Sequence, residues 1–248
     1  MYTEVHRVLL TYIRSVKSVK LQDLLDAFVL ICQRLGVEEE PTLNLLNQYI
    51  ADINIQISQQ GFKIERKNDE NDGSTYFIFI NTIVDEIMKE SSMYTTSELV
   101  SIRGIIEDII DARNFAFSTT RTQAQQIISA HQNKGIKDSA AFVDKLIDDG
   151  WFDATLNDHL ILSVKSLCEL KQYLIDGYGT SEDEDDGKLL LCRQCKEIVT
   201  MGLLTSEKIP FHRKCYEVYC RNNNNNNNND LQPTEQGQIR VGPDPSTL

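Results

Sequence analysis

The strongest constraint on the fold is a set of four residues near the C-terminal end, spaced C-x2-C-x16-H-x2-C: Cys192, Cys195, His212 and Cys215. Two close pairs of Cys or His that face each other across a loop are typical of a tetrahedral zinc site. Zinc–thiolate bonds can stabilise a module that is too small for a core of its own, so residues 189–221 are expected to need one zinc ion to fold. Because all four ligands come from the protein, the spacing predicts a closed, structural site rather than a hydrolytic one.

The charge balance and the absence of long apolar runs exclude several classes of protein. The chain has 248 residues, with 37 acidic and 25 basic side chains and a net charge of −12, which argues against a broad nucleic-acid surface. Its start, MYTEVHRVLL, lacks the pattern of a secretory signal, and no apolar run approaches the roughly 20 residues that span a bilayer. We therefore expect no membrane association and a reducing compartment, where clustered Cys and His residues serve as metal ligands. Cys32 and Cys168 lie in apolar helical patterns and are interpreted as buried packing residues.

The first third of the chain has the element order of a winged helix. Apolar residues recur at helical spacing over 2–16, 21–35 and 42–60. Two β-rich runs follow, at 62–65 and 76–80, with the turn-rich NDENDG between them. Three helices and then a hairpin predict a winged-helix domain over residues 1–90.

The same order repeats over residues 91–176. The patterns predict a helix, a short strand, two further helices, the two strands of a hairpin and a last helix, at 96–112, Phe115–Phe117, 120–132, 138–150, 151–152, 159–162 and 164–176. Asp138 is the expected cap of the third helix. The predicted fold is therefore mainly α with small β-hairpins, an α+β class with tandem winged-helix domains followed by a small zinc-binding module.

Two polar segments flank the zinc module. Residues 177–188 contain the acidic run SEDEDD and are interpreted as a solvated linker. Residues 222–229 are eight consecutive asparagines, and the polar tail that follows reaches Leu248. This low-complexity composition predicts disorder over 222–248.

Neither predicted recognition helix has the charge needed to read DNA. The helix at 42–60 contains no Lys or Arg and carries Asp52, and the helix at 138–150 has Lys145 among four aspartates. Acidic side chains repel phosphates, so direct nucleic-acid binding through these helices is not expected. The sequence favours winged helices that bind protein.

Two segments of the chain resemble one known family. CRQC…G…PFHRKCYEVYC resembles the variant RING of the non-structural maintenance of chromosomes element 1 family, and STYFIFINTIVDEIMKESSMYTTSELVSIRGIIEDII is similar to that family's middle region. The resemblance covers most of residues 1–220, although the sequence is diverged throughout. It implies a RING with eight ligands, in which the first and third pairs hold one zinc and the second and fourth pairs hold another.

This chain departs from that pattern in a coherent way. The first pair is Cys192 with Cys195, and the third is His212 with Cys215. Where the second pair is expected, after Gly202, the sequence reads LLTSEK, and the chain enters the asparagine run where the fourth pair should follow. All ligands of one zinc remain and all those of the other are gone, so we expect one zinc ion per chain.

The resemblance also implies a function and a set of partners. It implies a nuclear subunit of the structural-maintenance-of-chromosomes complex that serves DNA repair and recombination, bound to a MAGE-type subunit through its winged helices and joined by a kleisin-type subunit. The family's RING is a ubiquitin-protein ligase, which positions a ubiquitin-conjugating enzyme and uses no covalent intermediate of its own. No catalytic side chain is therefore expected.

Three interpretations remain open from the sequence. The first is a RING-type ligase within the complex, weakened because part of the recruiting surface is lost with the second zinc. The second is a non-catalytic scaffold subunit of the same complex. The third is an unrelated LIM-like adaptor, which would need a Cys near Val218 and is disfavoured for that reason.

Overall fold

The computed structural model describes residues 2–82, 94–182, 187–224 and 238–248. By its internal contacts the chain divides into two compact units, Met1–Asp69 with Ser74–Glu90, and Glu70–Gly73 with Ser91–Leu248. The short loop Glu70–Gly73 thus belongs to the second unit, although the strands on either side of it belong to the first. The segments described contain no helix that is both long enough and apolar enough to cross a membrane.

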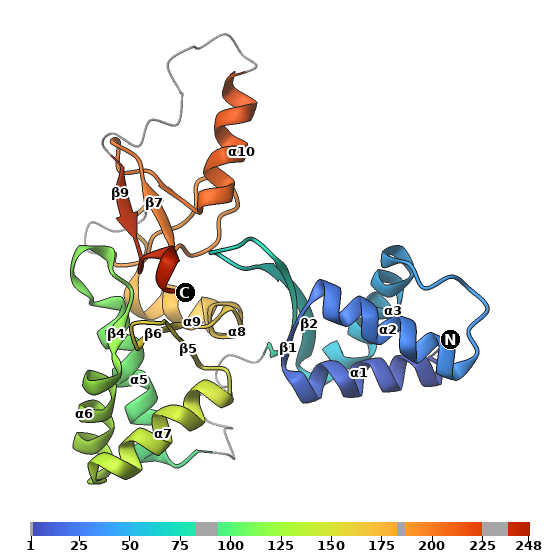
Figure 1. The fold of residues 1–248 in the computed structure, drawn as a ribbon, viewed down its shortest axis with the longest axis horizontal. Coiled ribbons are helices and arrows are strands. Elements are labelled where there is room, and N and C mark those ends of the chain that lie inside the picture. Colours follow the sequence, from blue (N-terminus) through green and yellow to red (C-terminus); the bar gives the residue numbers. More distant parts are fainter. Residues whose placement is uncertain (1, 83–93, 183–186, 225–237) are drawn as a thin grey trace. The chain divides into compact units, whose positions relative to one another are not determined.

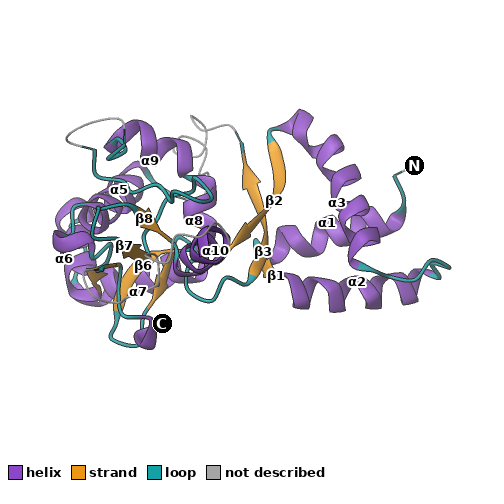
Figure 2. Cartoon of the chain, turned by 90° about the horizontal axis from the view of Figure 1, so that it is seen from above, coloured by secondary structure: helices purple, strands orange, loops and turns teal. Residues whose placement is uncertain are grey.

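The first unit combines three helices with a three-stranded sheet (Figure 1). Its elements are α1 (Glu4–Val16), β1 (Ser18–Lys20), α2 (Leu21–Leu35), α3 (Leu43–Ile57), η1 (Ser58–Gln60), β2 (Phe62–Asn68) and β3 (Thr75–Asn81). The strand order is β1-β3-β2, both pairings are antiparallel, and the helices lie together on one side of the sheet (Figure 2). This is the predicted winged-helix order, with β1 as a strand that the sequence did not indicate.

The helices of the first unit form because their apolar stripes meet in one core. Leu9, Leu24, Phe28 and Ile53 are fully buried there. Two hydrogen bonds orient α3 relative to the sheet. The side chain of Asn54 accepts one from the Ile64 amide at 2.7 Å and donates the other to the Ile64 carbonyl at 2.9 Å. This pair of bonds fixes α3 against β2, so helix and wing form one packed unit.

The second unit begins with another arrangement of helices and short strands. Its first elements are α5 (Thr96–Ile110), η2 (Arg113–Phe115), β4 (Thr119–Thr120), α6 (Arg121–Gln132), α7 (Ile136–Asp148), β5 (Phe152–Ala154), β6 (His159–Leu162), α8 (Val164–Glu169) and α9 (Lys171–Tyr178). The strand order β4-β6-β5 is antiparallel and matches that of the first unit in layout. Ile105, Ile128, Val143 and Leu160 are fully buried where α5, α6 and α7 meet the sheet. The mainly helical α+β fold class predicted from the sequence is confirmed.

Two local predictions in this region are wrong. Phe115–Phe117 is not a strand, because Phe115 ends the short helix η2 and both phenylalanines have positive φ angles, 56° and 40°. The edge strand lies two residues later, at Thr119–Thr120. Helix α7 begins at Ile136 with Gly135 as its N-cap, so Asp138 lies inside the first turn rather than at the cap.

The last predicted helix is divided in two. Ser163 caps α8 by accepting a hydrogen bond from the Ser166 amide, and the helix ends at Glu169. Leu170, with φ −93° and ψ 3°, breaks the geometry before α9 starts at Lys171. The apolar pattern over 164–176 hid this break, because Leu167, Leu170 and Leu174 all remain buried.

The C-terminal part of the second unit is a three-stranded sheet with one helix beside it. Its elements are β7 (Gly202–Leu204), β8 (Pro210–Phe211), α10 (Arg213–Asn224), β9 (Ile239–Val241) and η3 (Pro245–Thr247), in the strand order β8-β7-β9. The prediction of disorder across 222–248 is therefore wrong at both ends of that range. Asn224 still belongs to α10, and β9 pairs antiparallel with β7, with Val241 opposite Gly202 and 1% exposed.

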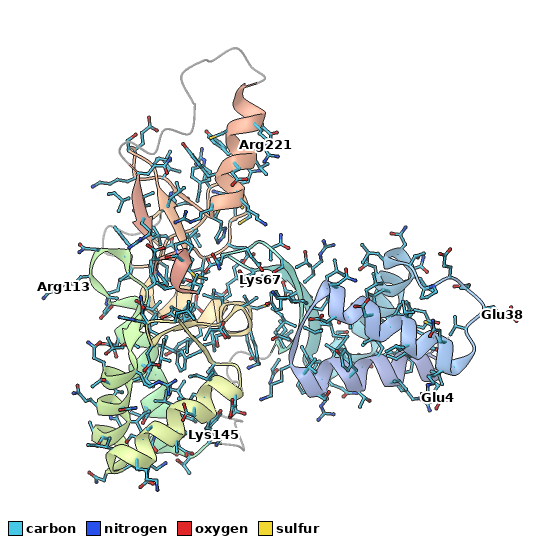
Figure 3. All side chains as sticks on the ribbon, in the orientation of Figure 1. Glu4, Glu38, Lys67, Arg113, Lys145 and Arg221 are labelled. Atoms are coloured by element: carbon cyan, nitrogen blue, oxygen red, sulfur yellow. The ribbon has the colours of Figure 1, made fainter. Side chains whose placement is uncertain are left out.

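Helices α3 and α7 occupy the positions of recognition helices in the two winged-helix arrangements. No Lys or Arg lies in α3. Helix α7 contains Lys137 as well as Lys145, because it starts earlier than predicted. Lys145, labelled in Figure 3, lies with its Nζ 4.5 Å from the ring centre of Tyr94, so part of its charge faces an aromatic ring of the same unit. The described side chains therefore give these helices no basic face for phosphates.

Candidate metal centre

The first predicted ligand pair lies on a tight turn. An antiparallel bridge between Leu191 and Ile198 closes the turn, and the Cys192 amide donates to the Glu197 carbonyl at 2.8 Å. Lys196 adopts a left-handed conformation with φ 60°, and its amide donates back to the Cys192 carbonyl at 2.8 Å. This geometry presents Cys192 and Cys195 on the same side of the turn.

The second predicted pair lies at the start of α10. The Tyr216 amide donates to the His212 carbonyl at 2.9 Å, so helical hydrogen bonding begins at His212. Cys215 follows three residues later, a spacing that places both side chains on one face of the helix. The ring of Phe211, just before this pair, packs on Tyr219 with 5.0 Å between ring centres.

The structure brings the two pairs together. The ligand atoms of Cys192, Cys195, His212 and Cys215 all lie within 4.8 Å of one another. His212 Nδ1 is 3.3 Å from Cys195 Sγ and 3.8 Å from Cys215 Sγ. Tetrahedral zinc with its usual bond lengths separates such atoms by roughly 3.5 to 3.8 Å, so the donor set and its spacing fit this metal. Within the described segments, no other group of three or more Cys, His, Asp or Glu side chains has this arrangement.

The pKa values of Cys192, Cys195 and His212 depend on one another. A hydrogen bond from Cys195 lowers the pKa of Cys192 to about 3, and the same contact raises the pKa of Cys195. Burial lowers the pKa of His212, but hydrogen bonds to the surrounding thiols and to Glu70 outweigh burial and raise it. The cluster therefore stabilises a thiolate, which is the form of cysteine that binds metal.

Strands of a sheet lie where the family resemblance would place the second and fourth ligand pairs. Between β7 and β8 the chain forms a hairpin in which the Thr205 amide donates to the Ile209 carbonyl at 3.0 Å. Gly202 starts this hairpin, and a Cβ there would lie 2.2 Å from the Phe211 carbonyl oxygen. Beyond α10, β9 adds to the other edge of β7. The described part of the module thus has one Cys/His cluster. The segments that would hold a second set of ligands form the strands of a sheet instead.

Glu70 also contacts the cluster, although no motif in the sequence predicts this contact. Glu70 belongs to the second unit and is 5% exposed. Its carboxylate accepts hydrogen bonds from the Thr200 amide at 3.0 Å and from Thr200 Oγ1 at 2.5 Å. His212 Nε2 lies 2.8 Å from Glu70 Oε1 and 3.1 Å from the Ile198 carbonyl oxygen. Glu70 and His212 are 142 positions apart, so no spacing rule could have joined them.

The remaining cysteines and histidines lie elsewhere. Cys32 is buried in the first unit, as predicted, whereas Cys168 is only half-buried. Cys220, on α10, is buried and does not belong to the cluster. His6 is buried against Tyr49, with 4.4 Å between ring centres, and belongs to no cluster of metal ligands in the described segments.

Comparison with known families decides where the chain belongs. A family model described as the Nse1 non-SMC component of the SMC5-6 complex matches residues 6–170. The chain belongs to the Nse1 family. The match spans both winged-helix arrangements and ends before the Cys/His cluster.

Curated Nse1 relatives and a solved structure agree with this assignment. Non-structural maintenance of chromosomes element 1 of Schizosaccharomyces pombe is 26% identical over 208 residues, which cover 77% of this chain and 81% of that protein. The homologue from Xenopus tropicalis is 26% identical over 71% of this chain and 63% of its own length, and the human homologue is 21% identical over 75% and 67%. A chain of an Nse1-Nse3-Nse4 complex superimposes with a TM-score of 0.78 at 20% identity, covering 96% of this chain and 97% of that one. The Nse1 fold therefore extends over the module as well.

Proposed function

We propose that the chain is a subunit of an SMC5-6 complex in the nucleus, where it acts in DNA repair and recombination. The observation that carries this proposal is the Nse1 family match over residues 6–170, in a family described as a component of that complex. Its partners would be a MAGE-type subunit, corresponding to Nse3, and a kleisin-type subunit, corresponding to Nse4. Support for these partners is the likeness to a chain solved within an Nse1-Nse3-Nse4 complex.

The winged helices are the proposed docking region for the MAGE-type subunit. Their candidate recognition helices lack a basic face, as described above, which favours protein over nucleic acid as the ligand. Co-expression of the full chain with the MAGE-type and kleisin-type subunits of the same organism tests this. We expect a complex with one copy of each that survives gel filtration with mass detection. Recovery of this chain alone, with the other two subunits paired and folded, would disprove the assignment.

The Cys/His cluster is proposed to hold one zinc ion. Cys192, Cys195 and Cys215 would supply sulfur ligands and His212 would supply Nδ1, which leaves no open position for water or substrate. When bound, the metal would cross-link the turn at 192–195 to the start of α10 and would have no hydrolytic role. Elemental analysis of the purified full chain should give one zinc per chain. A value near zero would remove the metal centre, and a value near two would require a second site.

A scaffold role is favoured over ubiquitin ligase activity. Hairpin β7–β8 carries no Cys or His side chain, so the loop that would surround a second zinc is held by hydrogen bonds between Thr205 and Ile209 instead of by a metal. Ligase activity remains the family's alternative, because the first ligand set is retained. Ubiquitin transfer by the zinc-loaded complex, assayed with a panel of conjugating enzymes, separates the two. No transfer is expected, and robust chain formation that depends on Cys195 would overturn the scaffold assignment.

A further inference from the structure

Glu70 is a buried carboxylate in a place where packing alone does not require one. Only 2% of its side chain is exposed. Burying a carboxylate costs free energy unless hydrogen-bond donors replace the lost water. Thr200 supplies two donors, its amide and its hydroxyl, and the third contact is with the ring of His212. The position is therefore built to keep a negative charge beside one ring nitrogen of a candidate metal ligand.

This contact decides which nitrogen of His212 carries the proton. Nε2 faces two acceptors, Glu70 Oε1 at 2.8 Å and the Ile198 carbonyl oxygen at 3.1 Å. Since both partners accept, Nε2 must donate, so the neutral ring, which is the form that binds metal, has its lone pair on Nδ1. Nδ1 is the atom that lies 3.3 Å from Cys195 Sγ and 3.8 Å from Cys215 Sγ. The ring is thus held in the tautomer and orientation that metal binding requires.

A separate contact holds the segment that carries Glu70. Lys214 Nζ donates to the Asp72 carbonyl oxygen, and Lys214 lies between His212 and Cys215 at the start of α10. The loop Glu70–Gly73 is therefore attached both at the ligand ring and beside the second ligand pair. Two attachments leave the carboxylate little freedom to move away from the ring.

We propose that Glu70 is a positioning residue for the metal centre: its carboxylate accepts a hydrogen bond from the Nε2–H group of His212 and aims Nδ1 at the three cysteine sulfurs. The inference rests on the proposed zinc site and adds a residue outside the Cys/His motif to it. The Glu70 carboxylate, rather than the Ile198 carbonyl, dominates because it is closer and charged, and charge-assisted hydrogen bonds are about twice as strong as neutral ones. Outer partners of this kind raise metal affinity by roughly 10 to 100-fold.

The test uses the full chain with the isosteric substitution Glu70→Gln and the truncation Glu70→Ala. Glu65→Gln is the matched control, because Glu65 lies on β2 of the same hairpin, is half-exposed and pairs with Lys63 at 3.2 Å. Zinc affinity is measured by competition with a chromophoric chelator. We expect affinity to fall at least 10-fold in both Glu70 variants and to stay unchanged in Glu65→Gln.

Two spectroscopic measurements separate ring positioning from a loss of folding. The visible absorption bands of the cobalt-loaded chain report ligand geometry, and they should shift in Glu70→Gln but not in the control. In the zinc-loaded wild-type chain, the imidazole Nε2 proton of His212 should be protected from solvent exchange, and it should exchange faster in Glu70→Gln.

Each outcome bears on a different claim. If the wild-type chain binds zinc, and Glu70→Gln and Glu70→Ala match it in affinity, cobalt bands and proton exchange, the role of Glu70 is disproved while the metal centre stands. If the wild-type chain binds neither zinc nor cobalt, the metal centre itself fails. Should Glu70→Ala not fold, Glu70→Gln decides the question, because it preserves the shape of the side chain.

Discussion

The first unit and the zinc module hold their folds together by different means. In the first unit, Leu9, Leu24 and Phe28 are fully buried in a continuous apolar core formed by three helices and a sheet. The module has short strands and one helix around a smaller apolar cluster that includes Leu189, Ile198 and Phe211. It also brings four sulfur and nitrogen ligands within 4.8 Å of one another. Burial of apolar surface stabilises one region, and a proposed metal cross-link stabilises the other. The two regions should therefore respond to different perturbations.

Loss of a metal ligand should give the largest effect and confine it to the module. Cys192→Ser removes a buried thiolate, so we expect zinc to be lost and residues 189–221 to unfold, since closed zinc sites supply most of the folding free energy of small modules. Hydrogen exchange followed by mass spectrometry should show full exchange there and wild-type protection over α1–α3. Cys168→Ser, a matched change outside the cluster, should keep the zinc. Loss of protection from exchange in the first unit would show that the two regions do not unfold independently.

A core truncation should produce the reverse pattern. Phe28→Ala removes a fully buried ring from α2 and should lower the free energy of unfolding of the first unit by about 3 to 5 kcal/mol. Leu30→Ala on the same helix, where the side chain is 62% exposed, should change it by less than about 0.5 kcal/mol. Urea denaturation with and without a chelator measures both. If Phe28→Ala also lowered the zinc content, the regions would not be energetically separate.

The last strand sharpens the comparison, because Val241 adds one more buried apolar side chain to the sheet beside the Cys/His cluster. Val241→Ala should destabilise the β7–β9 pairing by about 2 kcal/mol, since the side chain is 1% exposed. Ile239→Ala on the same strand, 48% exposed, is the control and should have little effect. Exchange rates of the amides in Gly202–Leu204 report the difference. Equal rates in the two variants would mean that the metal alone holds this sheet.

The smallest expected effect comes from a helix cap. The Thr120 side chain accepts a hydrogen bond from the Gln123 amide at 3.2 Å and forms a capping box at the start of α6. Thr120→Ala should cost about 1 kcal/mol of stability in the second unit and leave metal binding unchanged. Thr122→Ala, an exposed position two residues later, should be neutral or slightly stabilising. Thermal unfolding followed by circular dichroism distinguishes the two variants. Equal changes in their melting temperatures would show that the Thr120 cap does not stabilise the helix.

Local patterns predicted the long elements, and non-local pairing explains the errors. Helices such as α2 and α6 were predicted to within a residue or two, because their apolar spacing and end signals are contained in the segment itself. Strand β1 was missed because Ser18–Lys20 becomes a strand only by pairing with Tyr76–Ile78, far along the chain. The tail was predicted as disordered for a similar reason, since Ile239–Val241 has no partner until β7 is in place.

The candidate site also combines residues that local patterns predict with residues that only the fold brings together. The four Cys and His positions were predicted from their spacing, because paired ligands are local by construction and metal geometry dictates the intervals. Glu70 and Thr200 lie outside that pattern, and only the fold brings them to His212. Comparison of the sequence with the family's eight-ligand pattern indicated that a second ligand set is lost. It did not indicate that β9 would pair at the edge of β7.

The position of β9 has a consequence for the asparagine repeat. Helix α10 ends at Asn224 and β9 begins at Ile239, so the strand that completes the sheet is encoded after the asparagine repeat. Closing a chain segment becomes costlier only with the logarithm of its length, by about 0.6 kcal/mol for each doubling. Insertion or deletion of a few asparagines should therefore be nearly silent, whereas a frameshift inside the tract would replace the strand that follows it.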